Sequence, residues 1–137
     1  MDQAILETFE RSLGRCTSQT GFLDRFYDRF LASSPKVKEK FQDTDFVRQK
    51  RALKASLHLI LLAAGDEDGD AGKYLADVAE KHNAKNLDIG AELYDLWLDS
   101  LLETVKESDP EWSDEVGRAW EEVMMVGIHY LTVRYNA

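Results

Sequence analysis

The chain has little of what cross-links or interrupts a polypeptide. Its 137 residues include one cysteine, Cys16, so no internal disulfide can form, and this favours a reducing compartment. Only two prolines and eight glycines interrupt it, which allows long regular elements. Basic residues are also scarce, since 17 Lys and Arg stand against 26 Asp and Glu, a net charge of −9. Nucleic acids and anionic membrane surfaces carry the same sign, so we expect neither as a partner.

The sequence also has no segment with the pattern of a leader or a membrane span. The first residues carry no basic cluster followed by an apolar stretch. The longest apolar stretch, residues 57–64, contains His58 and is far shorter than the roughly 20 residues that a spanning helix needs. We therefore expect a cytoplasmic protein with a single domain over residues 1–137.

What the sequence does have is apolar residues recurring every three or four positions, which is typical of amphipathic helices. No segment alternates with period two, so we predict no strand. The predicted helix faces are Ile5, Phe9 and Leu13; Phe22, Phe26 and Phe30; Gln49, Leu53, Leu57, Ile60 and Leu61; Leu75, Val78, Ala79 and His82; Ile89, Leu93, Leu96, Trp97, Leu101 and Val105; and Val116, Ala119, Trp120, Val123, Gly127 and Tyr130.

Turn residues predict where these helices begin and end. Ser34 followed by Pro35 is typical of an N-cap and a first helical position, and it predicts a further short helix up to Phe41. Residues 65–72 (GDEDGDAG) predict a break, and residues 108–110 a stop and a fresh start. The result is an all-α protein of six to eight helices of uneven length, which we expect to cross at large angles around a shared interior.

Several chemistries are excluded by missing patterns. There is no glycine-rich phosphate loop and no zinc-protease helix motif. The acidic residues after Gly65 could suggest a calcium-binding loop. Such a loop needs glycine at its sixth position and glutamate at its twelfth, but counting from Asp66 these positions are Ala71 and Asp77. We expect a solvated loop there.

The three histidines differ in context. His58 lies one step off the apolar face of its helix, and we expect it at or near the surface. His129 lies beside the apolar face of the last predicted helix, where a structural role is the default. His82 ends an apolar stripe, so its imidazole should point inward. An inward imidazole is often only a hydrogen-bonded core residue, but it is also what holds a metal in an apolar pocket.

A resemblance to a known family favours the second interpretation of His82. The segments that carry it are residues 26–30 (FYDRF), 34–41 (SPKVKEKF), 81–83 (KHN), 94–97 (YDLW) and 119–120 (AW). In their order and spacing they resemble the globin family. The similarity is greatest to single-domain bacterial haemoglobins and to the globin portion of flavohaemoglobins, and it extends over nearly the whole chain. It implies a globin fold, with the helices packed around a haem pocket.

The resemblance implies a role for several residues. His82 matches the proximal histidine that ligates haem iron, and Phe41 the phenylalanine that packs on the haem face. Tyr27 matches the distal tyrosine that hydrogen-bonds the ligand. Gln49 matches the first distal residue of the long helix, and Leu53, one turn on, the apolar residue above the iron.

The register of the distal residues on the long helix has alternatives. The stretch from Phe41 to Gln49 is about two residues shorter than in the flavohaemoglobins, so Arg48 or Lys50 could take the place given to Gln49. Val78 and Trp97 complete the apolar residues expected to contact haem. The 137 residues do not include the flavin and nicotinamide domain of flavohaemoglobins, and they have no match for the glutamate that this family places near the end of the last helix.

The function that the resemblance implies is a globin that binds haem b and reversibly binds O₂ and other diatomic ligands, NO and CO among them. An enzymatic variant is NO dioxygenase activity, which would need an external reductase. The alternative is a haem-based gas sensor acting through a separate partner protein. A haem-free interaction protein of globin shape is a further alternative, against which His82 and Tyr27 together argue.

Overall fold

Seven helices make up the part of the chain that the structure describes. The computed structural model describes residues 1–65, 70–83 and 89–134, and no residue in these ranges lies in a strand. The all-α class and the number of helices predicted from the sequence are therefore confirmed. The helices are α1 (Gln3–Thr17), α2 (Phe22–Ser33), α3 (Pro35–Lys40), α4 (Phe46–Gly65), α5 (Asp70–His82), α6 (Ala91–Ser108) and α7 (Asp114–Val133).

Short polar side chains start three of these helices. Asp2, Ser34 and Ser113 each accept a hydrogen bond from a backbone N–H two or three residues further on, at 2.9 to 3.2 Å. Pro35 occupies the first position of α3, where its missing N–H leaves no donor unsatisfied. These caps satisfy N–H groups that have no partner within the helix, and the predicted start at Ser34 and Pro35 is confirmed.

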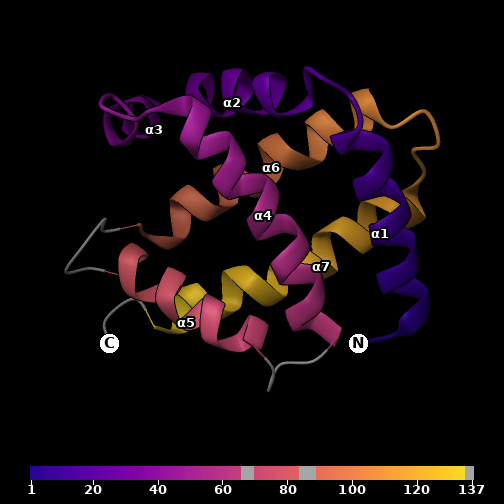
Figure 1. Ribbon diagram of the computed structural model, residues 1–137. Helices are drawn as coiled ribbons and strands as arrows, with labels where there is room; N and C mark the ends of the chain where they lie inside the picture. Colours follow the sequence, from indigo (N-terminus) through magenta and orange to yellow (C-terminus); the bar gives the residue numbers. More distant parts are fainter. Residues whose placement is uncertain (66–69, 84–88, 135–137) are drawn as a thin grey trace.

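The helices cross one another and do not form a parallel bundle (Figure 1). α1 and α6 both pack on α7, α2 packs on α6, and α4 packs on α5 and α7. In the view of Figure 1, α2 and α3 lie at one end and α5 at the other, with α4 running between them. α4 is therefore the element that links residues of α2 to residues of α5.

Large aromatic side chains form the centre of the core. Phe9, Phe22, Phe26 and Trp120 are fully buried. The ring of Phe9 meets that of Trp120 at an angle of 69°, with 4.7 Å between the centroids. Burying each such side chain contributes about 1.5–3 kcal/mol, so this cluster fixes the crossing of α1, α2 and α7.

A buried polar network fastens α1 to the connection between α6 and α7. The Asp109 carboxylate, whose side chain is fully buried, accepts hydrogen bonds from Ser12 at 2.6 Å, from two nitrogens of Arg15 at 2.7 and 2.9 Å, and from the Glu111 N–H at 2.8 Å. Trp120 donates its indole N–H to the Ser12 hydroxyl at 2.8 Å. Burial alone would raise the pKa of Asp109, but the hydrogen bonds and charge of Arg15, with those from Ser12 and Glu111, outweigh it and lower the pKa. The carboxylate therefore stays ionised inside the protein.

Two predicted boundaries were wrong. Ile89 lies before α6 and not on its face, because its backbone N–H is donated to the carbonyl oxygen of His82 at 3.0 Å and α6 begins only at Ala91. The break predicted over residues 65–72 is shorter, since α5 begins at Asp70, where an acidic residue suits the positive end of the helix dipole. The rest of the acidic loop, residues 66–69, lies outside the described residues.

Candidate functional site

The imidazole of His82 is held in one tautomer at the end of α5. Its Nδ1 lies 2.7 Å from the carbonyl oxygen of Val78, one turn earlier in the same helix. A carbonyl only accepts, so Nδ1 carries the proton and Nε2 keeps its lone pair. Burial is the main reason that the pKa of His82 is lowered, and the nearby charge of Lys81 acts in the same direction. The result is a neutral imidazole whose Nε2 has no partner among the described residues, which is the form that ligates a metal.

The other two histidines are not placed for such a role. His58, on α4, and His129, on α7, are both exposed. Only His82 is withdrawn from solvent, so only His82 could ligate a group enclosed by the helices.

Tyr27 is the buried hydroxyl of α2. Its side chain is only 4% exposed, and its ring packs edge-on against Phe26, Phe41 and Phe46 with centroids 5.0 to 6.2 Å apart. Burial raises the pKa of Tyr27 to about 12, although a hydrogen bond with the side chain of Gln49 lowers it in part. The side chain of Gln49 is therefore the polar group that interacts with the phenol of Tyr27.

The structure distinguishes the three residues considered for the first distal position on α4. Gln49 is half-buried and bonded to Tyr27. Arg48 is exposed. Lys50 forms an ion pair with Asp24 of α2, so its ammonium points away from the interior. Of the three, Gln49 alone contacts the predicted ligand-binding tyrosine.

Aromatic rings close the space beside Tyr27. Phe41 ends α3 and packs against Phe30 with ring centroids 5.7 Å apart, and Phe46 begins α4 and stacks on Phe41 at 6.1 Å. Sequence reasoning missed Phe46. Its position three residues before Gln49 was the available signal, since residues at that spacing share a helix face.

The remaining predicted contacts are apolar and lie on three helices. Leu53, one turn after Gln49 on α4, is 7% exposed. Trp97 of α6 is half-buried, and its ring meets that of Phe26 at 79°. Val78 of α5 is half-buried and supplies the carbonyl that orients His82. No hydrogen bond or ring contact within the described part of the chain joins the His82 group, on α5, to the Tyr27 group, on α2 and α4.

A third polar group lies near the start of α6. The hydroxyl of Tyr94 is buried and has no hydrogen-bond partner among the described residues. Burial raises the pKa of this phenol as well. The backbone bond between Ile89 and His82 brings the start of α6 to the end of α5, and Tyr94 follows one turn later. A buried hydroxyl without a partner is costly, so this position calls for a polar atom that the described protein does not supply.

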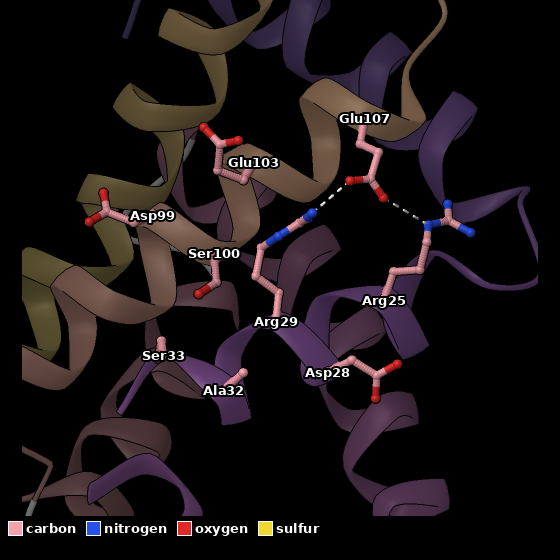
Figure 2. Close-up of a pocket in the computed structure, with 9 residues that line it drawn as sticks. All are labelled: Arg25, Asp28, Arg29, Ala32, Ser33, Asp99, Ser100, Glu103 and Glu107. Atoms are coloured by element: carbon pink, nitrogen blue, oxygen red, sulfur yellow. Dashed lines mark hydrogen bonds and ion pairs between the residues drawn. The ribbon is translucent and has the colours of Figure 1, made fainter. Parts of the chain in front are cut away.

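A hollow elsewhere on the surface lies between α2 and α6 (Figure 2). Two arginines that line it, Arg25 and Arg29, pair with Glu107. Arg29 donates to Glu107 at 2.6 Å and to Thr104 at 2.9 Å, and Arg25 lies 3.8 Å from Glu107. None of the predicted site residues lines this hollow, whose lining is Arg25, Asp28, Arg29, Ala32, Ser33, Asp99, Ser100, Glu103 and Glu107.

Two other kinds of site are absent from the ranges that the structure describes. No three residues among His, Cys, Asp and Glu come together as a metal-binding group there. None of the helices there combines the length and the apolar character needed to cross a lipid bilayer. Cys16 is fully buried, and burial raises the pKa of its thiol to about 11, so it is not a reactive thiolate.

Comparisons with known proteins agree with this arrangement. The family model described as Globin matches residues 24–131. The crystal structure of the protein PA3967 from Pseudomonas aeruginosa PAO1, described there as structurally highly homologous to a human hemoglobin, is similar over 97% of this chain and 99% of that chain, with 38% identity and a TM-score of 0.91. No protein with a curated description matches.

Proposed function

Because the chain belongs to the globin family, we propose that it is a haem protein that binds haem b and reversibly binds O₂ and other diatomic gases. Membership of the family implies haem binding. The observation that carries the proposal for this chain is the state of His82, a neutral imidazole with Nδ1 bonded to the Val78 carbonyl and with no hydrogen-bond partner for Nε2 among the described residues. A histidine that ligates a metal is normally oriented by such a bond from its other ring nitrogen.

The residues present fit the group. Haem is large and mostly apolar, and Phe41, Phe46, Leu53 and Trp97 offer apolar surface on α3, α4 and α6. The unpartnered hydroxyl of Tyr94 is a polar atom of the kind that a bound group or its water would satisfy. When bound, haem supplies an iron with one coordination position free for a diatomic gas.

The chain's own residues then select among gases. With a pKa raised to about 12, Tyr27 is protonated at neutral pH and donates a hydrogen bond into the space beside it. A diatomic ligand that carried partial negative charge, as O₂ would on a haem iron, would gain more from the Tyr27 donor than a less polar ligand such as CO. If the bond is worth about 1.5–3 kcal/mol, it slows O₂ release on the order of ten- to a hundredfold.

Gln49 and the aromatic rings support this donor. Gln49 supplies the polar side chain that interacts with the phenol. Phe41 and Phe46 flank the Tyr27 ring and exclude water, which would otherwise compete for the phenol proton.

An absorption spectrum of the purified protein tests the proposal. The protein reconstituted with hemin should show an intense Soret band, and the reduced form should shift reversibly with O₂ and with CO. A colourless protein that ignores hemin would contradict haem binding. NO consumption with an added reductase would extend the proposal to NO dioxygenase activity, and reversible O₂ binding without it would limit the protein to binding O₂.

A further inference from the structure

The ion pair between Asp24 and Lys50 joins the two helices that carry the distal residues. The Lys50 ammonium, on α4, contacts the Asp24 carboxylate, on α2. The Lys50 side chain is 33% exposed and that of Asp24 is 55% exposed. The pair therefore lies at the surface end of the contact between α2 and α4, where salt can screen it.

The pair lies beside the hydrogen bond between Gln49 and Tyr27. On α2, Asp24 precedes Tyr27 by three residues, so both side chains emerge on the same side of the helix. On α4, Lys50 directly follows Gln49. The same two helices are thus joined twice, by an ion pair outside and by a hydrogen bond inside.

The first turns of α4 have few other attachments. Asp45 caps the helix by accepting bonds from the N–H groups of Val47 and Arg48 at 3.1 and 3.4 Å, and Phe46 packs on Tyr27. Val47 is 64% exposed. α2 and α4 are not among the helix pairs with extensive contacts, so the ion pair and the packing of Phe46 on Tyr27 are among the few links between the start of α4 and α2.

Charge makes the outer link more important. The first turn of α4 has no acidic residue. Its first turns instead carry four cations, Arg48, Lys50, Arg51 and Lys54. Cations are unfavourable at a helix N-terminus, where the dipole is positive. Asp45 supplies one negative charge at the N-terminus of α4, and Asp24 supplies a second from α2, beside Lys50.

We propose that the ion pair between Asp24 and Lys50 is a latch that keeps Gln49 bonded to Tyr27, and so sets how firmly the distal pair holds a diatomic ligand. The inference rests on the proposed function. Lys50 and Asp24 are positioning residues, since they act through Gln49 and Tyr27. Opening the latch frees the start of α4, and the phenol then loses its contact with Gln49.

Charge-removal variants of Lys50 test the latch. In Lys50→Met the ion pair is lost with little change in side-chain length, while Lys50→Arg keeps the charge. The double variant Asp24→Lys with Lys50→Asp reverses the pair. Lys54→Met is the matched control, because Lys54 is exposed on the same helix and has no ion-pair partner in the described part of the chain.

Backbone hydrogen exchange measures how firmly the start of α4 is held, and it needs no bound gas. In Lys50→Met the backbone amides of residues 46–53 should exchange faster than in the parent protein, and in Lys50→Arg, the reversed pair and Lys54→Met they should not. Unchanged exchange in Lys50→Met, or an equal increase in Lys54→Met, would overturn the latch whether or not the protein binds haem.

Ligand measurements on the reconstituted protein test whether the ion pair affects how firmly a diatomic ligand is held. O₂ dissociation should become about two- to fivefold faster in Lys50→Met, which is the size expected from a partly exposed ion pair. The C–O stretching band of the CO form should shift toward that of a pocket with a weaker donor. High salt should move the parent protein toward the same values and leave Lys50→Met unchanged. An O₂ dissociation rate and a C–O band that Lys50→Met and salt both leave unchanged would overturn the proposal, whereas failure to bind hemin would contradict the proposed function alone.

Discussion

The side chain of Gln49, on α4, is hydrogen-bonded to the phenol of Tyr27, on α2. The bond joins a half-buried amide to a phenol that is 4% exposed. Two helices together therefore set the surroundings of the phenol. Predictions about ligand binding therefore concern the pair, and those about stability concern the burial of the phenol.

Replacing Tyr27 by phenylalanine removes the phenol proton and keeps the ring. We expect O₂ to dissociate faster on the order of ten- to a hundredfold, because the lost hydrogen bond is worth about 1.5–3 kcal/mol, while CO dissociation changes little. Stopped-flow measurement of both rates checks this. Tyr130→Phe is the matched control, since Tyr130 lies on α7 and makes no contact with Tyr27 or Gln49 among the described residues. An O₂ rate equal in Tyr27→Phe and the parent protein would show that the donor is another residue.

Alkaline pH should destabilise the protein through Tyr27. The ordinary phenol pKa is 10, and burial raises that of Tyr27 to about 12. Below pH 10 the phenol is neutral in both states and its contribution to the free energy of unfolding is complete. Between pH 10 and about pH 12 the unfolded chain loses the proton first, so stability falls by up to about 1.4 kcal/mol per pH unit.

Urea unfolding of Tyr27→Phe and the parent protein across this range isolates the contribution. We expect the parent to lose stability with pH more steeply than the variant. Parallel pH profiles would contradict a raised pKa for this phenol.

The Asp109 network should be the most sensitive polar element of the fold. Asp109→Asn leaves the Arg15 guanidinium without its buried counter-charge, and we expect a loss of about 2–4 kcal/mol in the free energy of unfolding. Asp95→Asn, at an exposed position of α6, should change stability by less than about 0.5 kcal/mol. Equal losses in the two variants would mean that the network is not what fastens α1.

The same carboxylate predicts part of the acid response. The pKa of Asp109 is lowered from its ordinary value of 3.8, so its contribution is complete above pH 3.8 and is lost as the pH falls further, through the folded-state pKa. The difference in unfolding free energy between the parent protein and Asp109→Asn should therefore shrink below pH 3.8. A difference that does not depend on pH would contradict this.

Haem should stabilise the folded chain, because it binds that state and not the unfolded one. With free hemin at 1,000 times the dissociation constant, the gain is about 4 kcal/mol, and the thermal midpoint should rise on the order of ten degrees. Calorimetry of the haem-free and reconstituted proteins checks this. Equal midpoints would contradict specific binding to the folded state.

The sequence could predict those features that depend on residues within a single helix. The Phe22, Phe26 and Phe30 stripe lies within one helix, so its period was enough to predict that face. His82 could be predicted to face inward because it ends the stripe of Leu75, Val78 and Ala79 in the same helix. The start of α3 followed from the preferences of Ser34 and Pro35 alone.

What the sequence could not predict depends on how helices cross. Ser12 meets Asp109 across 97 residues and Trp120 across 108, and no local pattern contains such pairs. The distal register is of the same kind. Gln49, not Arg48 or Lys50, reaches Tyr27 only because of how α4 is rotated over α2, and one residue along a helix turns a side chain by about 100°.

The most direct test of the account is haem ligation by His82→Gly with and without added imidazole. The cavity left by the side chain should accept free imidazole, and His58→Gly, altered at an exposed position of α4, is the control. We predict that His82→Gly loses the CO-difference spectrum of a histidine-ligated haem, that imidazole restores it, and that His58→Gly keeps it throughout. A His82→Gly protein that shows the parent spectrum without imidazole would contradict the account.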